Sequence, residues 1–421
     1  MRVYVGSLGC KLNQSEMDSL AGQLAQGGHQ IVATPGEAEL CVLNTCAVTH
    51  VAAQKSRQAL RHLHRENPAA RLIATGCYAA LSPTDLRDLP GVALVVGNRG
   101  KDRLAELIGT GAADPVPGSW RPAPHLRTRA FVKIQDGCDN ACTYCVIHLA
   151  RGAQRSRPPD EVVAEVQARL AAGYREIVLT GVHIGAYGHD RGPGSPDLWA
   201  LVTRLLAETD VPRLRLSSIE PWDLPEWAFR LWADPRLCRH LHLPLQSGCD
   251  ATLQRMNRRY TTARFAALIS AARAAIPGLA VTGDLIVGFP GETEAEFAES
   301  LAFVQAVGFA RLHIFPYSPR PGTPAATMPH QVPSSLKEER ARAMRQVAAI
   351  SSRAFRQQFI GQTMEVLWES CRPGDAGPVW SGLTDNYLRI YTTSLADLSN
   401  TLTPTRLITL AGDGLHGQIE R

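Results

Sequence analysis

The first hundred residues alternate short apolar runs with stretches that repeat apolar residues at helical spacing. The apolar runs are RVYVGSLGC at 2–10, AELCVLNTC at 38–46 and ARLIATGC at 70–77. Helical patterns at 15–26 and 52–66 separate them, and such a spacing is typical of βαβ units with parallel strands. The pattern predicts an N-terminal, doubly wound α/β domain over residues 1–112.

Each of these three runs ends on a cysteine: Cys10, Cys46 and Cys77. Because the carboxyl ends of parallel strands meet at one edge of a sheet, we expect the three thiols to converge there as a metal site. The alternative is that each is a small buried hydrophobe, which is the usual role of a free cysteine. Cys41 lies inside its strand, and for this residue we favour the core role.

A segment rich in proline and glycine, at 113–126, is expected to link this domain to the next region. Six more strand-like runs follow, separated mostly by helical patterns: AFVKIQ, EIVLTG, RLRLSS, HLHLPLQ, VTGDLIVG and ARLHIFPYS. Their order predicts a partial (βα)6 barrel over residues 127–350, with its chemistry at the carboxyl ends of the strands. Short β-like runs with glycine and proline turns predict a small C-terminal β-barrel at 355–421.

Composition indicates the environment of the chain. Its 421 residues are 45% hydrophobic and 20% charged, which is typical of globular proteins. The N-terminus lacks the features of a signal peptide, and no run reaches the ~20 apolar residues that a membrane span requires. We therefore expect a cytoplasmic protein without a membrane partner, whose ten cysteines are thiols or metal ligands rather than disulfides.

The loop after the first barrel strand, QDGCDNACTYCVIHLARG at 135–152, contains Cys138, Cys142 and Cys145. A short loop that supplies three thiolates and no fourth ligand suits a [4Fe-4S] cluster with one open iron. A structural zinc site requires four ligands, and no HExxH or similar histidine pair supports a zinc-dependent hydrolase. The CxxxCxxC spacing, with Tyr144 before the last cysteine, resembles the radical S-adenosylmethionine superfamily.

This resemblance implies that the open iron binds S-adenosylmethionine, whose reductive cleavage yields a 5′-deoxyadenosyl radical. Thr180 and Gly181 are candidates for contact with the methionyl amine. Gly283 and Gly288 are candidates for close approach to the adenosine, although glycines also simply end strands. Polar or aromatic candidates around the barrel mouth, where loop hydrogen bonding or packing is the alternative role, are Tyr144, Ser218, Glu220 and Gln246.

The motifs GCKLNQSE, LNTCAVT, ATGC and GCDNACTYCVIHLARG together resemble the methylthiotransferase family over essentially the whole chain. The resemblance implies an auxiliary [4Fe-4S] cluster on Cys10, Cys46 and Cys77, in addition to the radical cluster on the second triad. It also implies a C-terminal TRAM barrel, and S-adenosylmethionine as both methyl donor and radical source. The auxiliary iron would carry or activate the sulfur that is inserted.

Within that family, GCKLN with NTCAVTHVAAQKSRQ resembles the branch that acts on N6-threonylcarbamoyladenosine in tRNA. This branch methylthiolates carbon 2 of N6-threonylcarbamoyladenosine, immediately 3′ of the anticodon. The alternatives in the family are isopentenyladenosine in tRNA and an aspartate of a small-subunit ribosomal protein. Outside the family, a non-catalytic iron–sulfur RNA-binding protein is the alternative. The sequence identifies neither the sulfur donor nor the electron donor.

Two groups of arginines are candidates for contact with tRNA phosphates. The first follows one face of a predicted helix, and the alternative for it is an ordinary solvated helix face. The second follows the cysteine loop. The six residues are Arg57, Arg61 and Arg65 in the helix and Arg151, Arg155 and Arg157 after the loop.

The C-terminal region has no basic excess, since residues 355–421 contain five arginines, no lysine and seven acidic residues. Stacking on Trp368, Trp380 or Tyr387 is therefore one hypothesis for RNA contact there, and a core role is the alternative. His148 lies three residues after Cys145. We do not expect it to be a cluster ligand, because a fourth protein ligand would displace S-adenosylmethionine.

Overall fold

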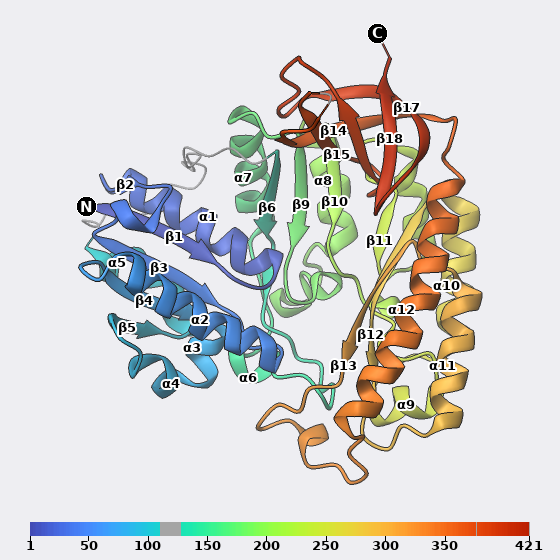
Figure 1. The fold of residues 1–421 in the computed structure, drawn as a ribbon, viewed down its shortest axis with the longest axis horizontal. Coiled ribbons are helices and arrows are strands. Elements are labelled where there is room, and N and C mark those ends of the chain that lie inside the picture. Colours follow the sequence, from blue (N-terminus) through green and yellow to red (C-terminus); the bar gives the residue numbers. More distant parts are fainter. Residues whose placement is uncertain (110–127, 376, 421) are drawn as a thin grey trace.

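The computed structural model describes residues 1–109, 128–375 and 377–420, so the expected linker at 113–126 lies outside the described residues. The described elements form three units in chain order: a parallel sheet with helices, a partial barrel and a small closed β-barrel (Figure 1). None of the described helices is both long enough and apolar enough to cross a membrane.

The N-terminal unit is a five-stranded parallel sheet in the order β2-β1-β3-β4-β5, which confirms the predicted doubly wound α/β fold. Alternate residues of β3 belong to two different cores, one on each face of the sheet. A strand buried on both faces carries a continuous apolar run, and β3 does so until its last two residues, the buried Asn44 and Thr45. The elements are β1 Arg2–Ser7, α1 Lys11–Gln26, β2 Gln30–Ile31, β3 Leu40–Thr45, α2 His50–Glu66, β4 Arg71–Gly76, α3 Cys77–Leu81, α4 Pro83–Arg87, β5 Val92–Val96 and α5 Leu104–Ile108.

The central unit contains the six predicted parallel strands. They form two three-stranded sheets, β10-β9-β6 and β11-β12-β13, joined by isolated parallel bridges such as Ser218 to His242. Between β10 and β11 the connection is a 3-10 helix at Glu226–Ala233 instead of an α-helix. The strands are β6 Arg129–Lys133, β9 Glu176–Thr180, β10 Arg213–Leu216, β11 His240–His242, β12 Ala280–Val287 and β13 Arg311–Pro316.

Helices cover the outside of this partial barrel, and loops carry its shorter elements. Between the described residues of β6 and β13 no pairing is formed, so the barrel is open on that side. The long helices are α7 Pro159–Ala171, α8 Leu198–Glu208, α10 Thr262–Ala275, α11 Glu294–Val307 and α12 Ser334–Gln357. The short elements are β7 Gln135–Asp136, α6 Ile147–Arg151, β8 Arg155–Ser156 and α9 Asp250–Arg255.

The C-terminal unit is a closed barrel in the order β14-β15-β16-β18-β17, as predicted. Trp368 and Trp380 are buried in its core, so the hypothesis that they are stacking platforms for RNA is wrong. Residues of barrel strands alternate between the inside and the outside, and these two indoles point inside, where they fill the space between strands. Its strands are β14 Thr363–Arg372, β15 Val379–Thr384, β16 Arg389–Thr393, β17 Leu402–Ala411 and β18 Gly414–Ile419.

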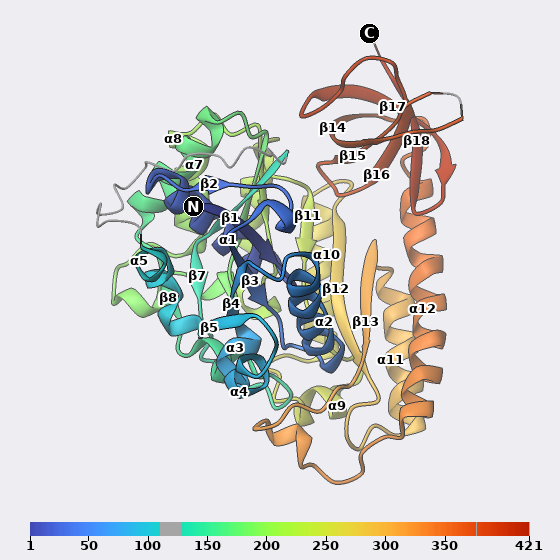
Figure 2. The same cartoon turned by 60° about the vertical axis from the view of Figure 1, so that its left-hand side comes forward.

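The C-terminal barrel packs against the amino ends of the central strands. Arg129, the first residue of β6, forms an ion pair with Glu369 at 2.5 Å. Arg215 donates to the carbonyl oxygen of Asp385, and the ring of His240 stacks on Tyr387 with 4.7 Å between centroids. Figures 1 and 2 show this barrel at the opposite end from α9 and from the loop that follows β13. The carboxyl ends of the strands therefore remain available for a site.

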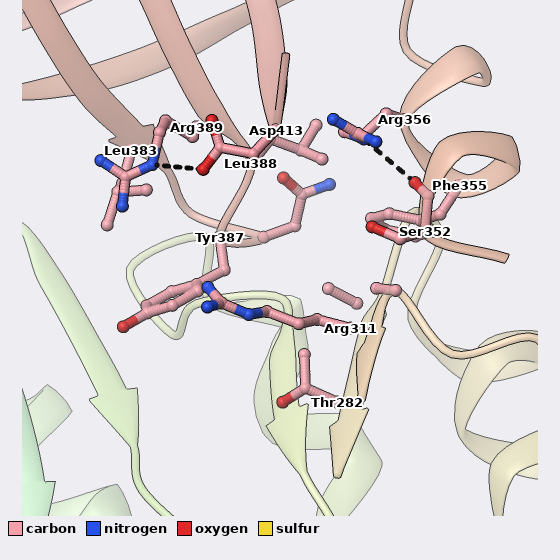
Figure 3. Close-up of a pocket in the computed structure, with 13 residues that line it drawn as sticks. Thr282, Arg311, Ser352, Phe355, Arg356, Leu383, Tyr387, Leu388, Arg389 and Asp413 are labelled. Atoms are coloured by element: carbon pink, nitrogen blue, oxygen red, sulfur yellow. Dashed lines mark hydrogen bonds and ion pairs between the residues drawn. The ribbon is translucent and has the colours of Figure 1, made fainter. Parts of the chain in front are cut away.

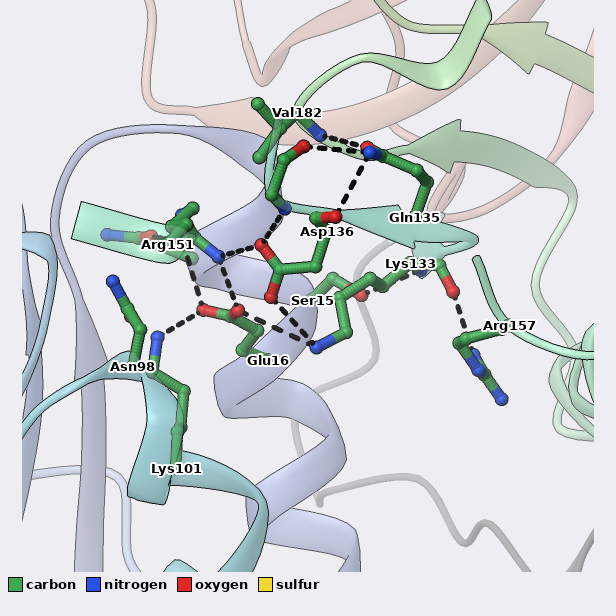
Figure 4. A network of polar contacts seen from close by, with 12 residues as sticks. Ser15, Glu16, Asn98, Lys101, Lys133, Gln135, Asp136, Arg151, Arg157 and Val182 are labelled. Carbon is green, nitrogen blue, oxygen red and sulfur yellow. Dashed lines mark hydrogen bonds and ion pairs between the residues drawn. The ribbon is translucent and has the colours of Figure 1, made fainter. Parts of the chain in front are cut away.

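Helix α1 of the N-terminal unit lies against β6, the edge strand of the open barrel. The backbone N–H of Lys133 donates to Ser15 Oγ at 3.1 Å, so a side chain replaces the missing neighbouring strand. The next residue of the helix, Glu16, accepts from Arg151 Nη1 at 2.8 Å and from Lys101 Nζ at 2.6 Å. These contacts join the first unit to the second (Figure 4).

The ion cluster around Arg151 is almost fully buried. The side chains of Arg151 and Glu16 are only 1% and 4% exposed, and Arg151 Nη1 also lies 2.8 Å from Asp136. Burial alone would raise the pKa of Glu16, but Arg151 and Lys101 hold it below its ordinary value. Charges removed from water in this way depend on one another, because any one left alone would be strongly destabilised.

We predict that Arg151→Met destabilises the docking of the N-terminal unit. The change leaves Glu16 and Asp136 buried without their shared cation, which costs about 3–5 kcal/mol. Chemical denaturation followed by circular dichroism measures the loss. The matched control is Arg103→Met, which removes an exposed ion pair to Glu106 and should change stability by less than about 1 kcal/mol. Equal effects of the two substitutions would contradict the prediction.

Candidate functional site: two facing cysteine triads

The three N-terminal cysteines lie together at the carboxyl edge of the parallel sheet, as predicted. Cys10 is the N-cap of α1, Cys46 follows β3 directly and Cys77 is the first residue of α3. The three thiols are close enough for electrostatic coupling, since Cys77 and Cys10 both raise the pKa of Cys46. The topology thus collects residues from three separate βα turns into one triad.

The backbone around this triad is tightly constrained. Gly9 has a φ of 96°, and a Cβ at this position would lie 2.8 Å from the Cys46 sulfur. Only glycine allows both the conformation and the close approach. The Cys46 N–H donates to Ser56 Oγ at 3.0 Å, which ties the turn to α2. Burial is the main reason that the pKa of the Cys46 thiol rises to about 11, so a metal must displace its proton.

The second triad lies on the loop between β7 and α6, at the carboxyl end of the first barrel strand. Backbone N–H groups of Asn140 and Ile147 donate to the sulfurs of Cys138 and Cys145 at 3.4 and 3.5 Å. Burial raises the pKa of Cys145 to about 12, with Cys142 and Cys138 adding to the effect. Sulfurs that accept N–H bonds and face one another are typical ligands of iron–sulfur clusters.

The chemistry of both triads suits an iron–sulfur cluster, because each offers three cysteine thiols. A cubane cluster binds each thiolate at a different iron. The two triads also share an interface, because Asn98 Nδ2 donates to Cys77 Sγ at 3.7 Å and to the Ala150 carbonyl at 2.8 Å.

Two of the cofactor-binding candidates lie beside the second triad. Arg258 Nη1 donates to Cys142 Sγ at 3.5 Å and to Glu220 Oε1 at 3.1 Å, so Glu220 is connected to the cysteine loop. Tyr144 packs edge-on against Phe289 after β12. These positions agree with a role at the barrel mouth, which for both residues stays a prediction.

Thr180 and Gly181 lie where β9 ends, as expected. A Cβ on Gly181 would lie 2.8 Å from the carbonyl oxygen of Gln135, so the glycine allows two loops to approach each other. The side-chain oxygen of Gln135 accepts from the backbone N–H groups of Val182 and His183 at 3.1 and 2.9 Å. Contact of Thr180 or Gly181 with a methionyl amine remains a prediction.

The remaining cofactor candidates divide by depth in the barrel. Ser218 and Gln246 lie just after β10 and β11, each in an isolated parallel bridge. Gly288 follows β12 with a φ of 69°. Gly283 instead lies inside β12, where a Cβ would meet the Leu243 carbonyl oxygen at 2.6 Å. The structure therefore gives Gly283 a strand-packing role, and contact of Gly283 or Gly288 with an adenosine stays a prediction.

Three residues that the sequence did not single out hold the cysteine loop. They are Gln135, Arg258 and His183. Burial alone would lower the pKa of His183, but its hydrogen bonds to Asp223 and Cys138 raise it to about 9. Gln135 is the first residue of the motif stretch and could have been noticed. Arg258 is 116 residues from Cys142, and no local pattern connects them.

His148 occupies a position that differs from that of a fourth ligand. Its Nδ1 lies 2.9 Å from the carbonyl oxygen of Cys138, and its side chain is exposed on α6. The ring thus stabilises the backbone of the loop. This geometry agrees with the expectation that His148 does not bind the cluster.

Some of the arginine candidates for RNA contact are exposed, and the others bind partners within the protein. Arg151 is buried in the ion cluster, so its assignment to RNA is wrong, because its guanidinium already binds Glu16 and Asp136. Arg157 pairs with Glu165 at 2.5 Å and donates to the Lys133 carbonyl, so its guanidinium is also engaged within the protein. Arg57 donates to the Tyr78 hydroxyl and is half-buried, whereas the three exposed candidates are Arg61, Arg65 and Arg155.

Comparison with known families and proteins agrees with this architecture. Residues 132–304 match the radical SAM superfamily, and residues 2–97 match the uncharacterized protein family UPF0004. The chain is 36% identical to threonylcarbamoyladenosine tRNA methylthiotransferase MtaB of Bacillus subtilis (strain 168), over 99% of this chain and 95% of that protein.

Relatives with other names have similar identity. A tRNA-2-methylthio-N(6)-dimethylallyladenosine synthase of Novosphingobium aromaticivorans is 35% identical over 99% of this chain and 96% of its own. Ribosomal protein uS12 methylthiotransferase RimO of Anaeromyxobacter sp. (strain K) is 37% identical over 87% and 81%. Overall identity therefore does not separate the substrates.

The fold also has a solved counterpart. The radical S-adenosylmethionine methyltransferase TsrM from Kitasatospora setae, solved with cobalamin and a [4Fe-4S] cluster, superposes with a TM-score of 0.56 over 77% of both chains at 18% identity. This likeness concerns the fold alone. Taken with the full-length relatives above 30% identity and the two cysteine triads, it leads to one conclusion: the chain belongs to the radical S-adenosylmethionine methylthiotransferase family.

Proposed function

We propose that this enzyme methylthiolates carbon 2 of N6-threonylcarbamoyladenosine, immediately 3′ of the anticodon in tRNA. The observation that carries the proposal is the GCKLN stretch at Cys10 together with NTCAVTHVAAQKSRQ, which resembles the branch with this substrate. Relatives named for that reaction support it, including MtaB of Thermotoga maritima, which is 38% identical over 87% of this chain.

As a family member, the enzyme is a transferase that uses two [4Fe-4S] clusters and S-adenosylmethionine. S-adenosylmethionine supplies the radical and the methyl group, the radical cluster would pass on the electron, and the auxiliary cluster would carry or activate the sulfur. Within this chain, Cys10, Cys46 and Cys77 would hold the auxiliary cluster, and Cys138, Cys142 and Cys145 the radical one. The protein's own contribution is to fix both triads across one buried interface and to exclude water between them.

We assign recognition of tRNA to exposed side chains near the two cysteine triads. Arg61 and Arg65 lie on the solvent face of α2, the helix that begins four residues after Cys46. Arg155 is exposed in β8, on the loop that follows the second triad. Exposed arginines on both sides of the triads would bind phosphates of an anticodon stem.

Two alternatives follow from the names of relatives: isopentenyladenosine in tRNA and an aspartate of ribosomal protein uS12. A non-catalytic iron–sulfur RNA-binding protein is disfavoured, because such a protein has no need for an open barrel around a three-cysteine loop. Anaerobic reduction with S-adenosylmethionine separates this last alternative, since a binder forms no 5′-deoxyadenosine.

A nucleoside profile tests the proposal directly. We expect tRNA from a host that lacks its own enzyme to gain the 2-methylthio form of threonylcarbamoyladenosine when this chain is expressed. Mass spectrometry of digested tRNA measures the nucleoside, and the Cys142→Ala variant is the matched control. Methylthiolation of isopentenyladenosine alone, with protein and clusters present, would overturn the substrate assignment.

Substitutions in the two triads should have different effects on activity. Cys46→Ala should abolish sulfur insertion but leave measurable 5′-deoxyadenosine, because its cluster is not the one that cleaves S-adenosylmethionine. Cys142→Ala should abolish both. Anaerobic assays with iron and sulfide analysis measure these activities. Equal loss of both activities in the Cys46 variant would argue against separate tasks.

His148→Ala should retain cleavage of S-adenosylmethionine. The His148 ring contacts a backbone carbonyl and not a thiol, so its removal weakens the loop without opening the cluster. Iron content should stay close to that of the wild type, and the rate of 5′-deoxyadenosine formation should stay within about tenfold, as expected for loss of one hydrogen bond of about 0.5–1.5 kcal/mol. Loss of the radical cluster in this variant would show that the histidine is a ligand.

A further inference from the structure

The inner wall of the partial barrel is polar, unlike the packed interior of a closed barrel. Along β12 and β13, alternate residues such as Leu285 and Leu312 point outward into the core under the helices. The residues between them point inward. An ordinary (βα)8 barrel fills this space with branched apolar side chains. Inward-facing polar residues of the last three strands are His240, His242, Thr282, Asp284, Arg311 and His313.

Five of these residues form one continuous surface, which we call the polar wall: His242, Thr282, Asp284, Arg311 and His313. The strand register places them side by side, since Thr282 pairs with both His242 and Arg311, and Asp284 pairs with His313. The two carboxylate oxygens of Asp284 lie 3.2 Å from His242 Nε2 and 3.1 Å from His313 Nδ1. Asp284 therefore fixes both rings, and the rings screen its charge.

The polar wall is accessible rather than packed. The side chain of His313 is 44% exposed, and Arg311 is exposed as well. In the described part of the chain, no hydrogen bond or ion pair joins Arg311 to a partner, although most arginines of this barrel have one. Figure 3 shows Arg311 beside Thr282 at the junction with the C-terminal barrel. A cation on a strand that faces inward and lacks a partner is available to a ligand.

The polar wall also lies below the cysteine loop. Ile286 belongs to the same inward face, and it packs in the small cluster that includes Tyr144 of the CxxxCxxC motif. Asp284 is two residues earlier in the strand, about 7 Å along it. A group that extends from the cysteine loop into the barrel would meet the wall.

The floor of the interior adds positive charge. Lys11, Arg129 and Arg215 surround Tyr387, and each places its charge within 6 Å of the ring centroid. Burial would raise the pKa of this tyrosine, but the three cations lower it below its ordinary value. Arg129 and Arg215 are also paired with Glu369 and Glu176, so much of this charge is balanced within the protein, and Arg311 is the cation of the wall that is open to an anionic ligand.

We propose that the polar wall binds the N6 substituent of the target adenosine, with Arg311 binding its carboxylate and His313 its hydroxyl or urea group. The inference rests on the proposed function and deepens it. A threonylcarbamoyl group has a carboxylate and several hydrogen-bonding atoms, whereas an isopentenyl group has none. An apolar substituent would leave Arg311 and the Nε2 atom of His313 without a partner in a partly desolvated space, and sites of this kind reject such analogues strongly.

Equilibrium binding to three anticodon stem-loops tests this inference. The RNAs differ only in the base 3′ of the anticodon: adenosine, N6-threonylcarbamoyladenosine or N6-isopentenyladenosine. The reconstituted enzyme with both clusters should prefer the threonylcarbamoyl RNA over unmodified RNA roughly tenfold or more, as one charge-assisted hydrogen bond implies. Arg311→Met and His313→Leu should each remove most of that preference and change binding of unmodified RNA by less than about twofold.

The control is Arg345→Met, an equal change of charge on the exposed face of α12, which should keep the preference. Iron content and thermal midpoint establish that each variant folds. If the wild type shows the preference and both wall variants retain it, the wall does not bind the substituent and this inference alone fails. If the wild type shows no preference and the nucleoside profile gives isopentenyl product, the proposed function fails and the inference with it.

Discussion

The buried ion cluster of Arg151, Glu16, Lys101 and Asp136 is the interaction on which the arrangement of the sites depends. The six-stranded barrel is open, and its edge strand β6 exposes backbone groups that need partners. Helix α1 supplies them, and the ion cluster fixes where along β6 the helix lies. Such buried charges contribute little net stability, but they strongly disfavour every docking position that leaves one of them unpaired. The position of one cysteine triad relative to the other follows from this constraint.

The two ends of the barrel consequently have different roles. At the amino ends of the strands, charged and aromatic contacts such as Arg129 to Glu369 and His240 to Tyr387 hold the C-terminal barrel. At the carboxyl ends, the loops carry thiols, backbone donors and the Glu220–Arg258 pair. The space between contains polar side chains rather than a packed core. This division explains how one chain can hold two clusters and still keep an interior for a modified base.

Much of this architecture could be predicted from the sequence because it depends on local periodicity. The convergence of the strand ends that carry Cys10, Cys46 and Cys77 could be predicted, because parallel topology brings such ends together independently of the side chains. The six barrel strands could also be predicted, because they depend on local periodicity. The role of Arg151 could not be predicted. The sequence shows that a residue near a motif is basic but not that it is buried, and the burial of Arg151 depends on Glu16, 135 residues away. The position of Gly283 inside β12 could not be predicted either, because glycine inside a strand and glycine after it look alike in sequence.

Electron paramagnetic resonance of the fully reduced enzyme tests the central claim, that the two clusters face each other across the Arg151 interface. Asn98 contacts both the Cys77 thiol and the helix that follows the second triad, so the two paramagnets should interact. The wild-type spectrum should therefore be broadened or split relative to the sum of the spectra of the two single-cluster variants. A wild-type spectrum equal to that sum would contradict the account, because it would place the clusters too far apart to share one substrate.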